Sequence, residues 1–164
     1  MAVLDAWGGL LPRPFETKGV MARRLKGVSR RQFDHGIVHL RQRGMVTIIS
    51  KKDKKFIKIT RAGQLELLLK KAKKPLKQQW DGKWRVIIFD IPENSKDKRH
   101  LFRALLKVNG FYKLQASVYI SPYSLNMEAI RYLKETGLID YIRILRVDKL
   151  DSDLFLKRRF GLKE

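Results

Sequence analysis

The stretch that most constrains the fold runs from Trp80 to Pro122, because it combines two β-strand patterns and one helix pattern in a short length. A near-continuous apolar run over residues 84–89 predicts a strand that is buried on both faces. Asp90 ends this run, and Pro92 in the turn that follows has no N–H group to donate to a sheet. A lone carboxylate is therefore expected at the carboxyl end of a central strand.

A helix is expected after this turn. Ser95 is its predicted N-cap, and Gly110 is predicted to end it in a left-handed conformation. The residues predicted to face the sheet are Leu101, Leu105 and Val108, which recur at helical spacing, with Phe102 and Leu106 beside them. The next apolar alternation covers residues 112–120 and predicts either one strand or two strands broken near Gln115.

Two more helices and one more strand are expected further along the chain. Asn126 begins a helix that ends near Gly137. The residues of this helix predicted to face inward are Met127, Ile130 and Leu133. Residues 141–147 alternate as a strand, and residues 152–160 form a short basic helix. The resulting order, β-α-β(β)-α-β, suits a ferredoxin-like α+β sandwich.

Two motifs in this half of the chain carry a family resemblance: the Asp-Ile-Pro-Glu turn and the Gly-Phe…Leu-Gln-Ala-Ser-Val run. Together they resemble the ferredoxin-like domain of the second CRISPR-associated protein (Cas-two). The WDGKWR opening and the SVYISP ending make the chain resemble more closely the Cas-two-like central domain of PaaX-type transcriptional regulators. The resemblance extends over residues 80–150. In the Cas-two family the matching aspartate sits at a two-fold dimer interface. The resemblance therefore implies a homodimer in which Asp90 could bind Mg²⁺ for phosphodiester cleavage.

The charge of the chain is strongly basic and uneven. It carries 37 lysine and arginine residues against 16 aspartate and glutamate residues, a net charge of +21. Residues 1–80 hold 20 basic and 5 acidic side chains, a net +15, whereas residues 81–164 hold 17 and 11, a net +6. This asymmetry indicates that the N-terminal half binds a polyanion, with nucleic acid favoured over an acidic membrane surface. The alternative is a basic face that only keeps the protein soluble.

Composition also limits the compartment. The chain has no cysteine, which excludes disulfides and cysteine-based zinc sites and fits a reducing cytosol. No apolar run approaches the ~20 residues that a membrane-spanning helix requires. The first residues lack the basic leader and the long apolar stretch of a secretory signal. We therefore expect a soluble cytoplasmic protein with no membrane partner.

The N-terminal half shows the order helix, helix, hairpin, helix. After irregular residues 1–16, a short helix over residues 16–26 precedes a stronger one over residues 30–43, which Ser29 caps and Gly44 ends. Two alternating runs around a lysine-rich turn predict a β-hairpin, and Thr60 caps the helix that follows. This order is the plan of a winged helix-turn-helix. The predicted organisation is a winged helix-turn-helix over residues 1–69, a basic linker over 70–82, and a ferredoxin-like, Cas-two-like dimerisation domain over 83–164.

The helix over residues 30–43 is the predicted recognition element. Its core face is Phe33, Ile37 and Leu40, and an α-helix of this width enters the DNA major groove. The residues predicted to contact DNA lie on its other faces and at the hairpin tip, and they are Arg30, Arg31, Gln32, His35, His39, Gln42, Lys51, Lys52, Lys54 and Lys55. The alternatives are a solvated helix face and a charged hairpin edge that resists aggregation.

Two further features have the residue types of a metal site, and each also has a simpler interpretation. His35 and His39 have the i, i+4 spacing of a metal pair, but no third ligand accompanies them, so a DNA-facing pair is preferred over zinc. Asp90 has no evident general base nearby, and the simpler reading is that it caps the turn or pairs with Arg85, Arg99 or Arg103.

The sequence therefore predicts a repressor-like transcriptional regulator that binds double-stranded DNA as a homodimer without a cofactor. The alternative is a Cas-two-type, Mg²⁺-dependent endonuclease with Asp90 as the catalytic metal ligand, or the partner of an integrase in CRISPR adaptation. Ribonuclease or RNA-binding activity is a weaker third reading, because no aromatic stacking platform lies among the basic residues.

Overall fold

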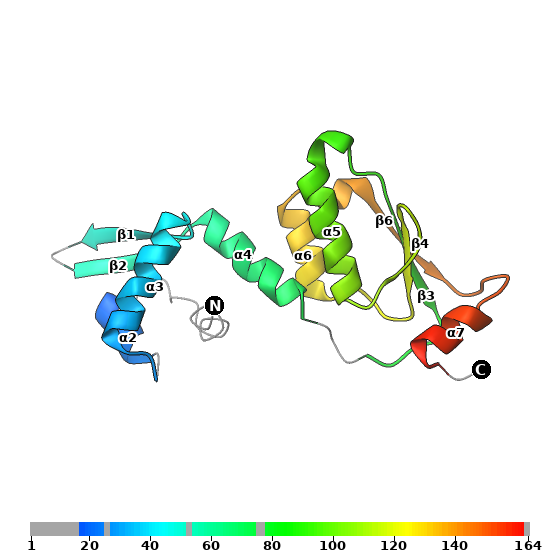
Figure 1. Cartoon of the computed structure of the whole chain (residues 1–164), viewed down its shortest axis with the longest axis horizontal. Helices are drawn as coiled ribbons and strands as arrows, with labels where there is room; N and C mark the ends of the chain where they lie inside the picture. The colour runs from blue at the N-terminus through cyan, green and yellow to red at the C-terminus, as the bar shows by residue number, and fades with distance from the viewer. Residues whose placement is uncertain (1–16, 25–26, 52–53, 75–77, 163–164) are drawn as a thin grey trace. The chain divides into compact units, whose positions relative to one another are not determined.

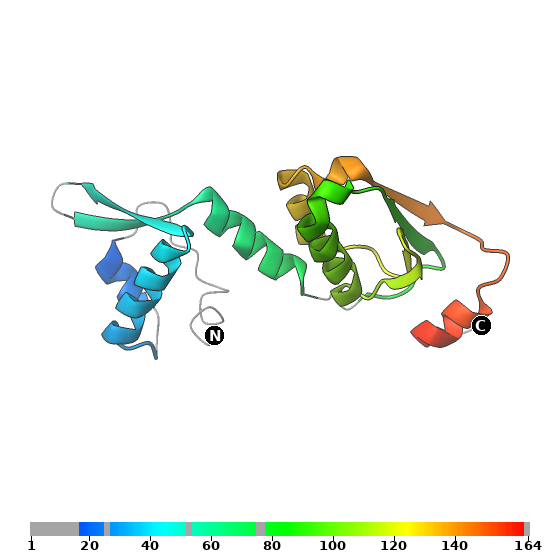
Figure 2. The same ribbon diagram turned by 45° about the horizontal axis from the view of Figure 1, so that its top comes forward.

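The computed structural model describes residues 17–24, 27–51, 54–74 and 78–162, and the predicted irregular segment of residues 1–16 lies outside this range (Figures 1 and 2). The chain divides into two compact units between Lys70 and Lys71. The units are described separately below. No helix of the described residues is both long enough and apolar enough to span a membrane.

The first unit contains helices and one hairpin in the predicted order. Its elements are α2 (Lys18–Arg24), α3 (Arg30–Gln42), β1 (Val46–Lys51), β2 (Lys54–Ile59) and α4 (Arg61–Ala72), the last of which crosses the division. β1 and β2 pair antiparallel, and both views show α3 lying beside this hairpin (Figures 1 and 2). The buried core joins α2, α3 and the hairpin and consists of Met21, Phe33, Ile37, Leu40, Val46 and Ile57.

Two predicted N-caps lie at the starts of α3 and α4. Ser29 forms a capping box with Gln32: the Ser29 Oγ accepts a hydrogen bond from the Gln32 N–H at 3.2 Å, and the Gln32 Oε1 accepts one from the Ser29 N–H at 2.9 Å. Thr60 accepts from the Gly63 N–H at 3.1 Å and donates its hydroxyl to the Gly44 carbonyl at 2.6 Å. Thr60 therefore starts α4 and also ties it to the turn after α3.

The hairpin has a third backbone partner. Thr17 forms an isolated antiparallel bridge with Phe56 of β2, on the strand edge that β1 leaves open. The turn between β1 and β2 contains residues 52–53, which lie outside the described residues. The Thr17 bridge gives the two-stranded sheet additional pairing, which a hairpin needs because two strands alone are marginally stable in water.

The second unit has the predicted α+β connectivity. Its strands are β3 (Trp84–Phe89), β4 (Tyr112–Gln115), β5 (Val118–Ser121) and β6 (Ile142–Val147), in the sheet order β4-β5-β3-β6 with all pairs antiparallel. Its helices are α5 (Lys96–Val108), α6 (Met127–Glu135) and α7 (Leu154–Phe160), with 3₁₀ turns η2 (Glu93–Ser95) and η3 (Leu138–Tyr141). The order β-α-β-β-α-β is that of a ferredoxin-like sheet, and α5 and α6 lie side by side in both views (Figures 1 and 2).

The central strand β3 is covered differently on its two faces, so the prediction of burial on both faces is wrong at one end. Ile87 and Phe89 are buried on one face, where the Phe89 ring meets Phe102 of α5 edge-on at 5.0 Å. On the other face Trp84 is buried against Leu156 and Phe160 of α7. Ile88 lies on that second face but is 40% exposed, because α7 packs at the Trp84 end of the strand.

Three local expectations in this unit are corrected. Ser95 occupies the N-cap position of α5, but its side chain makes no capping hydrogen bond because the chain enters through the 3₁₀ turn η2. Val108 is 45% exposed, although Phe102, Leu105 and Leu106 of the same predicted face are buried. Met127 at the start of α6 is 78% exposed rather than inward-facing.

The alternation over residues 112–120 forms two strands, β4 and β5, with the break after Gln115.

Candidate nucleic-acid interface

The exposed face of α3 carries the residues predicted to contact DNA. Arg31, His35 and Gln42 are exposed, and they project opposite the buried Phe33, Ile37 and Leu40. His39 is exposed at the flank of the same face, and Arg30 is exposed at the start of the helix. In the described part of the chain, the side chains of Arg31, His35 and Gln42 make no hydrogen bond or ion pair. This face therefore presents donors and acceptors that are available to a partner.

Gln32 differs from its neighbours. Its side-chain oxygen accepts a hydrogen bond from the Ser29 N–H at 2.9 Å, so it serves the start of the helix. The amide N–H₂ group of Gln32 retains donors for a partner, because only the oxygen is engaged. Gln32 is predicted from the sequence only as a DNA-contacting residue, although the spacing of Ser29 and Gln32 is also that of a capping box.

The hairpin tip carries two described lysine side chains. Lys54 and Lys55 are exposed at the start of β2, and Lys54 is in register with Lys51 at the end of β1. Lys52 lies outside the described residues. Two exposed ammonium groups at the end of a hairpin suit contact with a phosphate backbone, where a point charge suffices.

Several exposed side chains that the sequence analysis did not name lie on the same two elements. Arg41 lies in the last turn of α3, Arg43 is the C-cap of this helix, and Lys58 lies on β2. Val38 differs from these because it is apolar and 53% exposed on the outer side of α3. Projecting the helix at 100° per residue places Val38 away from the core, so its exposure could have been predicted from sequence spacing, whereas Arg41 and Arg43 project between the core and the outer side.

The histidine pair on α3 does not assemble a metal site. His35 and His39 are both exposed. Within the described residues no group of three histidine, aspartate or glutamate side chains gathers closely enough to hold a metal ion. A zinc site normally requires at least three protein ligands. The pair is therefore counted with the polar face of α3.

Asp90 stands exposed just after β3, as its place in the sequence predicted. Its backbone N–H donates to the Tyr141 carbonyl at 3.0 Å, which extends the pairing of β3 with the start of β6. The carboxylate has no hydrogen-bond or ion-pair partner among the residues that the structure describes. The expected pairing is wrong, because each arginine considered is engaged elsewhere: Arg85 with Asp81, Arg99 with Glu93 at 4.0 Å, and Arg103 with the Ala116 carbonyl at 3.1 Å.

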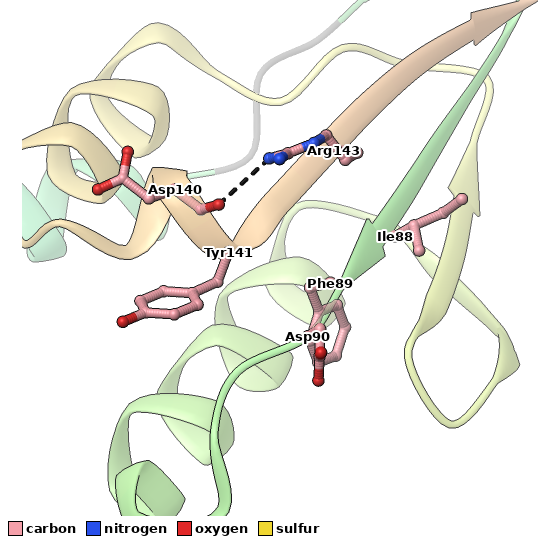
Figure 3. A pocket seen from close by; sticks show the side chains of 6 residues that line it. All are labelled: Ile88, Phe89, Asp90, Asp140, Tyr141 and Arg143. Carbon is pink, nitrogen blue, oxygen red and sulfur yellow. Dashed lines mark hydrogen bonds between the residues drawn. The ribbon is translucent and has the colours of Figure 1, made fainter.

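Asp90 borders an open pocket of about 340 Å³ (Figure 3). The pocket is lined by Ile88, Phe89, Asp90, Asp140, Tyr141 and Arg143. Figure 3 shows the carboxyl group of Asp140 directed away from that of Asp90, and Arg143 donates to the Asp140 backbone carbonyl at 3.2 Å. Mg²⁺ requires several converging oxygen ligands. A single carboxylate without a second one directed toward it does not form such a site within one described chain.

The WDGKWR motif forms a tight turn held by its own polar groups. The Arg85 guanidinium donates to both carboxylate oxygens of Asp81, at 2.6 and 2.7 Å, and to the Lys83 carbonyl at 2.6 Å. The indole N–H of Trp80 also donates to the Lys83 carbonyl, at 3.1 Å. The centroids of the Trp80 and Trp84 rings lie 5.5 Å apart. Gly82 has a φ of +79°, which a residue with a Cβ rarely adopts.

This turn also perturbs its ionisable groups. Hydrogen bonds from the Arg85 side chain and the Lys83 backbone, with the positive charges of Arg85 and Arg146 nearby, hold the pKa of Asp81 well below its ordinary value. The Nζ atom of Lys83 lies 2.6 Å from the Oδ1 atom of Asp148, and the hydrogen bond from Lys83 lowers the pKa of Asp148 in the same way. The motif is therefore a brace at the start of β3, and its charges are satisfied within the chain.

A second polar cluster holds the end of α4 in the second unit. Asn126 is buried, and its Nδ2 donates to the carbonyls of Ala72 and Lys74 at 2.8 and 3.0 Å and to Asn109 Oδ1 at 3.0 Å. Its Oδ1 accepts from the Ala129 N–H at 2.6 Å as the N-cap of α6. Asn109 also donates to the Ala72 carbonyl, at 2.9 Å. The predicted linker therefore begins with residues that are fixed to the second unit, before residues 75–77, which lie outside the described range.

The comparisons with known proteins agree with this architecture. Residues 77–154 match the family described as the PaaX protein central Cas2-like domain. This match covers β3 through β6 and includes the braced motif and the strand that ends at Asp90. A search of curated proteins found no match. The resemblance drawn from the sequence is confirmed over these residues: this part of the chain is similar to the central Cas2-like domain of PaaX proteins.

Proposed function

We propose that this protein is a transcriptional regulator that binds double-stranded DNA through α3 and the β1–β2 hairpin. The observation that carries the proposal is the exposed polar face of α3, on which Arg31, His35 and Gln42 have no partner in the described chain. Arginine and glutamine are the side chains that hydrogen-bond guanine and adenine edges in the major groove. The match to a PaaX-type domain supports the regulatory role.

The first unit is proposed to be a winged helix-turn-helix, in which α3 is the recognition helix and the hairpin is the wing. Several features support this assignment: the order of elements, the Thr17 bridge to β2, and the Thr60 hydroxyl that joins α4 to the turn after α3. In this arrangement Lys54 and Lys55 contact phosphates. They contribute affinity that depends on salt concentration and does not depend on sequence.

We further propose that the Cas2-like unit forms a homodimer. Ile88 and Leu145 lie on the sheet face that α7 leaves open, and they are 40% and 45% exposed. A second copy of the chain would cover these apolar side chains and would also present two α3 helices to one DNA site. Linking two half-site contacts raises affinity without requiring any new contact.

One observation favours a second candidate, a Mg²⁺-dependent nuclease or an integrase partner of the Cas-two type. The Asp90 carboxylate is exposed at the end of β3 and has no partner in the described chain. A metal site at Asp90 would need carboxylates from a second copy, because the described residues of one chain do not supply them. This candidate makes a distinct prediction, which is cleavage of DNA that depends on Asp90.

A single gel assay separates these functions. Labelled duplexes, including the DNA upstream of the protein's own gene, are titrated with the full chain in Mg²⁺ or in EDTA. We expect a mobility shift that prefers one duplex, persists in EDTA and leaves the DNA intact. Asp90→Asn serves as the control variant, since it keeps the size of the side chain and should leave the shift unchanged.

The opposite results would overturn the proposal. Cleavage that needs Mg²⁺ and is lost in Asp90→Asn would identify a nuclease. A shift with equal affinity for every duplex and no cleavage would instead indicate an architectural or integrase-partner role, because phosphate contacts alone give binding without sequence preference.

A further inference from the structure

Val38 is an apolar side chain in the middle of a polar helix face. It is 53% exposed on α3, and it lies between Arg31 and His35 on one side and Gln42 on the other. At 100° per residue, Arg31, His35, Val38 and Gln42 fall within roughly 60° of arc, so they form one stripe. We call these four residues the α3 stripe.

An isolated exposed valine is ordinary on a protein surface and by itself implies nothing. The position of Val38 is what matters. Its neighbours one turn away on the stripe, His35 and Gln42, are polar and exposed, and the stripe lies opposite the buried Phe33, Ile37 and Leu40. Valine also has a lower helix propensity than alanine. A valine here therefore does not contribute to the core and does not favour the helix.

We infer that Val38 contacts the C5-methyl group of a thymine in the major groove and so specifies an A·T pair. This inference rests on the proposed function, because it names what the α3 stripe recognises. Among the four bases only thymine presents a methyl group in the major groove, and apolar side chains are its usual partners. Arginine and glutamine on either side read guanine and adenine, so the stripe combines three kinds of base contact.

Charge identifies DNA as the partner of the stripe. Arg30 at the start of α3 and Arg41 and Arg43 at its C-terminal end are exposed, and Asp34, the one acidic residue in the sequence of α3, is half-buried. The N-terminal half of the chain carries a net +15. Packing the stripe against a second copy of itself would bring like charges together, which costs free energy. A polyanion with an apolar group at the floor of its groove fits both properties.

The experiment begins with the full chain and a random duplex library. Rounds of selection identify the preferred sequence, and each thymine in it is then replaced singly by deoxyuridine. This change removes only the methyl group and leaves every hydrogen bond of the base pair in place. We expect one thymine in each half-site at which the replacement weakens binding by roughly three- to fivefold, as expected for the loss of one buried methyl-sized contact.

The decisive comparison uses Val38→Ala. This variant should bind the thymine and deoxyuridine duplexes equally, because the side chain that contacts the methyl group is gone. Alanine favours the helix, so the variant should fold, and circular dichroism checks that it does. Val38→Thr keeps one of the two methyl groups and should retain part of the discrimination. Val108→Ala is the matched control, since Val108 is 45% exposed in the other unit.

The outcomes separate this inference from the proposed function. A defined preferred sequence in which every deoxyuridine replacement is neutral would overturn the role of Val38 and leave the regulator proposal standing. The same holds if the thymine preference persists in Val38→Ala. A library from which no preferred sequence emerges would overturn both. A methyl-dependent loss that disappears in Val38→Ala and persists in Val108→Ala would establish the contact.

Discussion

The two units use their charged side chains in opposite ways. In the second unit, cations are joined to anions of the same chain: Arg85 to Asp81, Lys83 to Asp148, and Lys157 to Asp153 at 3.3 Å. On α3 in the first unit, Arg31 and the polar residues along the same face have no such partner in the described structure. These three cations therefore stabilise the fold of the second unit, whereas the positive charge of Arg31 on α3 is available to another molecule.

The same contrast applies to buried polar groups. Asn126 in the second unit is 5% exposed, and both ends of its amide are used. In the first unit the buried residues of α3 are all apolar, and its polar side chains other than the half-buried Asp34 are exposed. Replacing a side chain whose hydrogen-bonding groups have partners within the chain should alter the stability of the fold. Replacing one whose groups have no such partner should alter binding to another molecule. The predictions below test this division.

The largest effect is expected from Asn126→Ala. The change removes the N-cap of α6 and leaves the carbonyl groups of Ala72 and Lys74 with fewer donors in a buried place. We expect a loss of roughly 2–3 kcal/mol in the free energy of unfolding of the second unit, from a lost cap and unsatisfied carbonyls. Urea denaturation followed by tryptophan fluorescence reports it, since Trp80 and Trp84 lie in this unit.

Asn94→Ala is the matched control, because Asn94 is exposed in the η2 turn. It should change the unfolding free energy by less than about 0.5 kcal/mol, as exposed substitutions usually do. Equal destabilisation by the two variants would mean that the buried amide cluster does not hold the second unit together.

An intermediate effect on binding is expected from Arg31→Ala. The variant should lose roughly 1–3 kcal/mol of affinity for the preferred duplex, the value of a good base contact, and should relax the preference at one base pair. Its melting temperature should not change, because Arg31 has no described partner within the chain. Fluorescence anisotropy with the labelled duplex measures the affinity.

The control is Arg131→Ala on α6, which removes the same charge from an exposed site in the other unit. It should weaken binding by no more than the loss of a distant charge does. If Arg131→Ala matched Arg31→Ala in both affinity and sequence preference, the exposed face of α3 would not be the reading surface.

The smallest effect is expected from Asp81→Asn, and it depends on pH. Asp81 has a pKa below its ordinary value of 3.8, so the ionised carboxylate stabilises the folded state above that value. This contribution is lost as the pH falls below about 4, as the carboxylate becomes protonated. The stability difference between the wild type and Asp81→Asn should therefore be present at pH 7 and shrink toward pH 2.

Thermal melts of both proteins across this pH range measure that difference, and DNA affinity at pH 7 should be the same for both. Asp148 titrates in the same window in each protein, so only the difference between them is informative. A difference that stayed constant down to pH 2 would show that the Arg85–Asp81 pair does not contribute through its charge.

Much of the fold follows from local patterns. The helix spacing of Phe33, Ile37 and Leu40 correctly predicted the buried face of α3, and Ser29 and Thr60 cap helices as their residue types indicate. The strand and helix order of the Cas2-like unit was also predictable, because each element is long enough to show its own periodicity. The residues of α3 proposed to contact DNA could be named because they depend on spacing along a single helix.

Other features depend on segments far apart in the sequence. Ser95 has the residue type of a cap, but the 3₁₀ turn before α5 leaves its side chain without a capping bond. Ile88 is apolar and yet exposed, because α7 covers only the Trp84 end of the sheet. Asp90 lies near arginines in sequence that pair elsewhere in the structure. None of these outcomes is contained in a short sequence window.

The sequence by itself determined which faces of the helices and strands are apolar, where the positive charge concentrates, and which family the second unit resembles. These properties arise from residue type and spacing, which act over a few residues. The tertiary structure alone decided which polar groups find partners, as when Asn126 reaches the carbonyl of Ala72, 54 residues away. Hydrogen bonds and ion pairs require contact within a few ångströms, so only the folded chain separates the charges that brace it from those left for a partner.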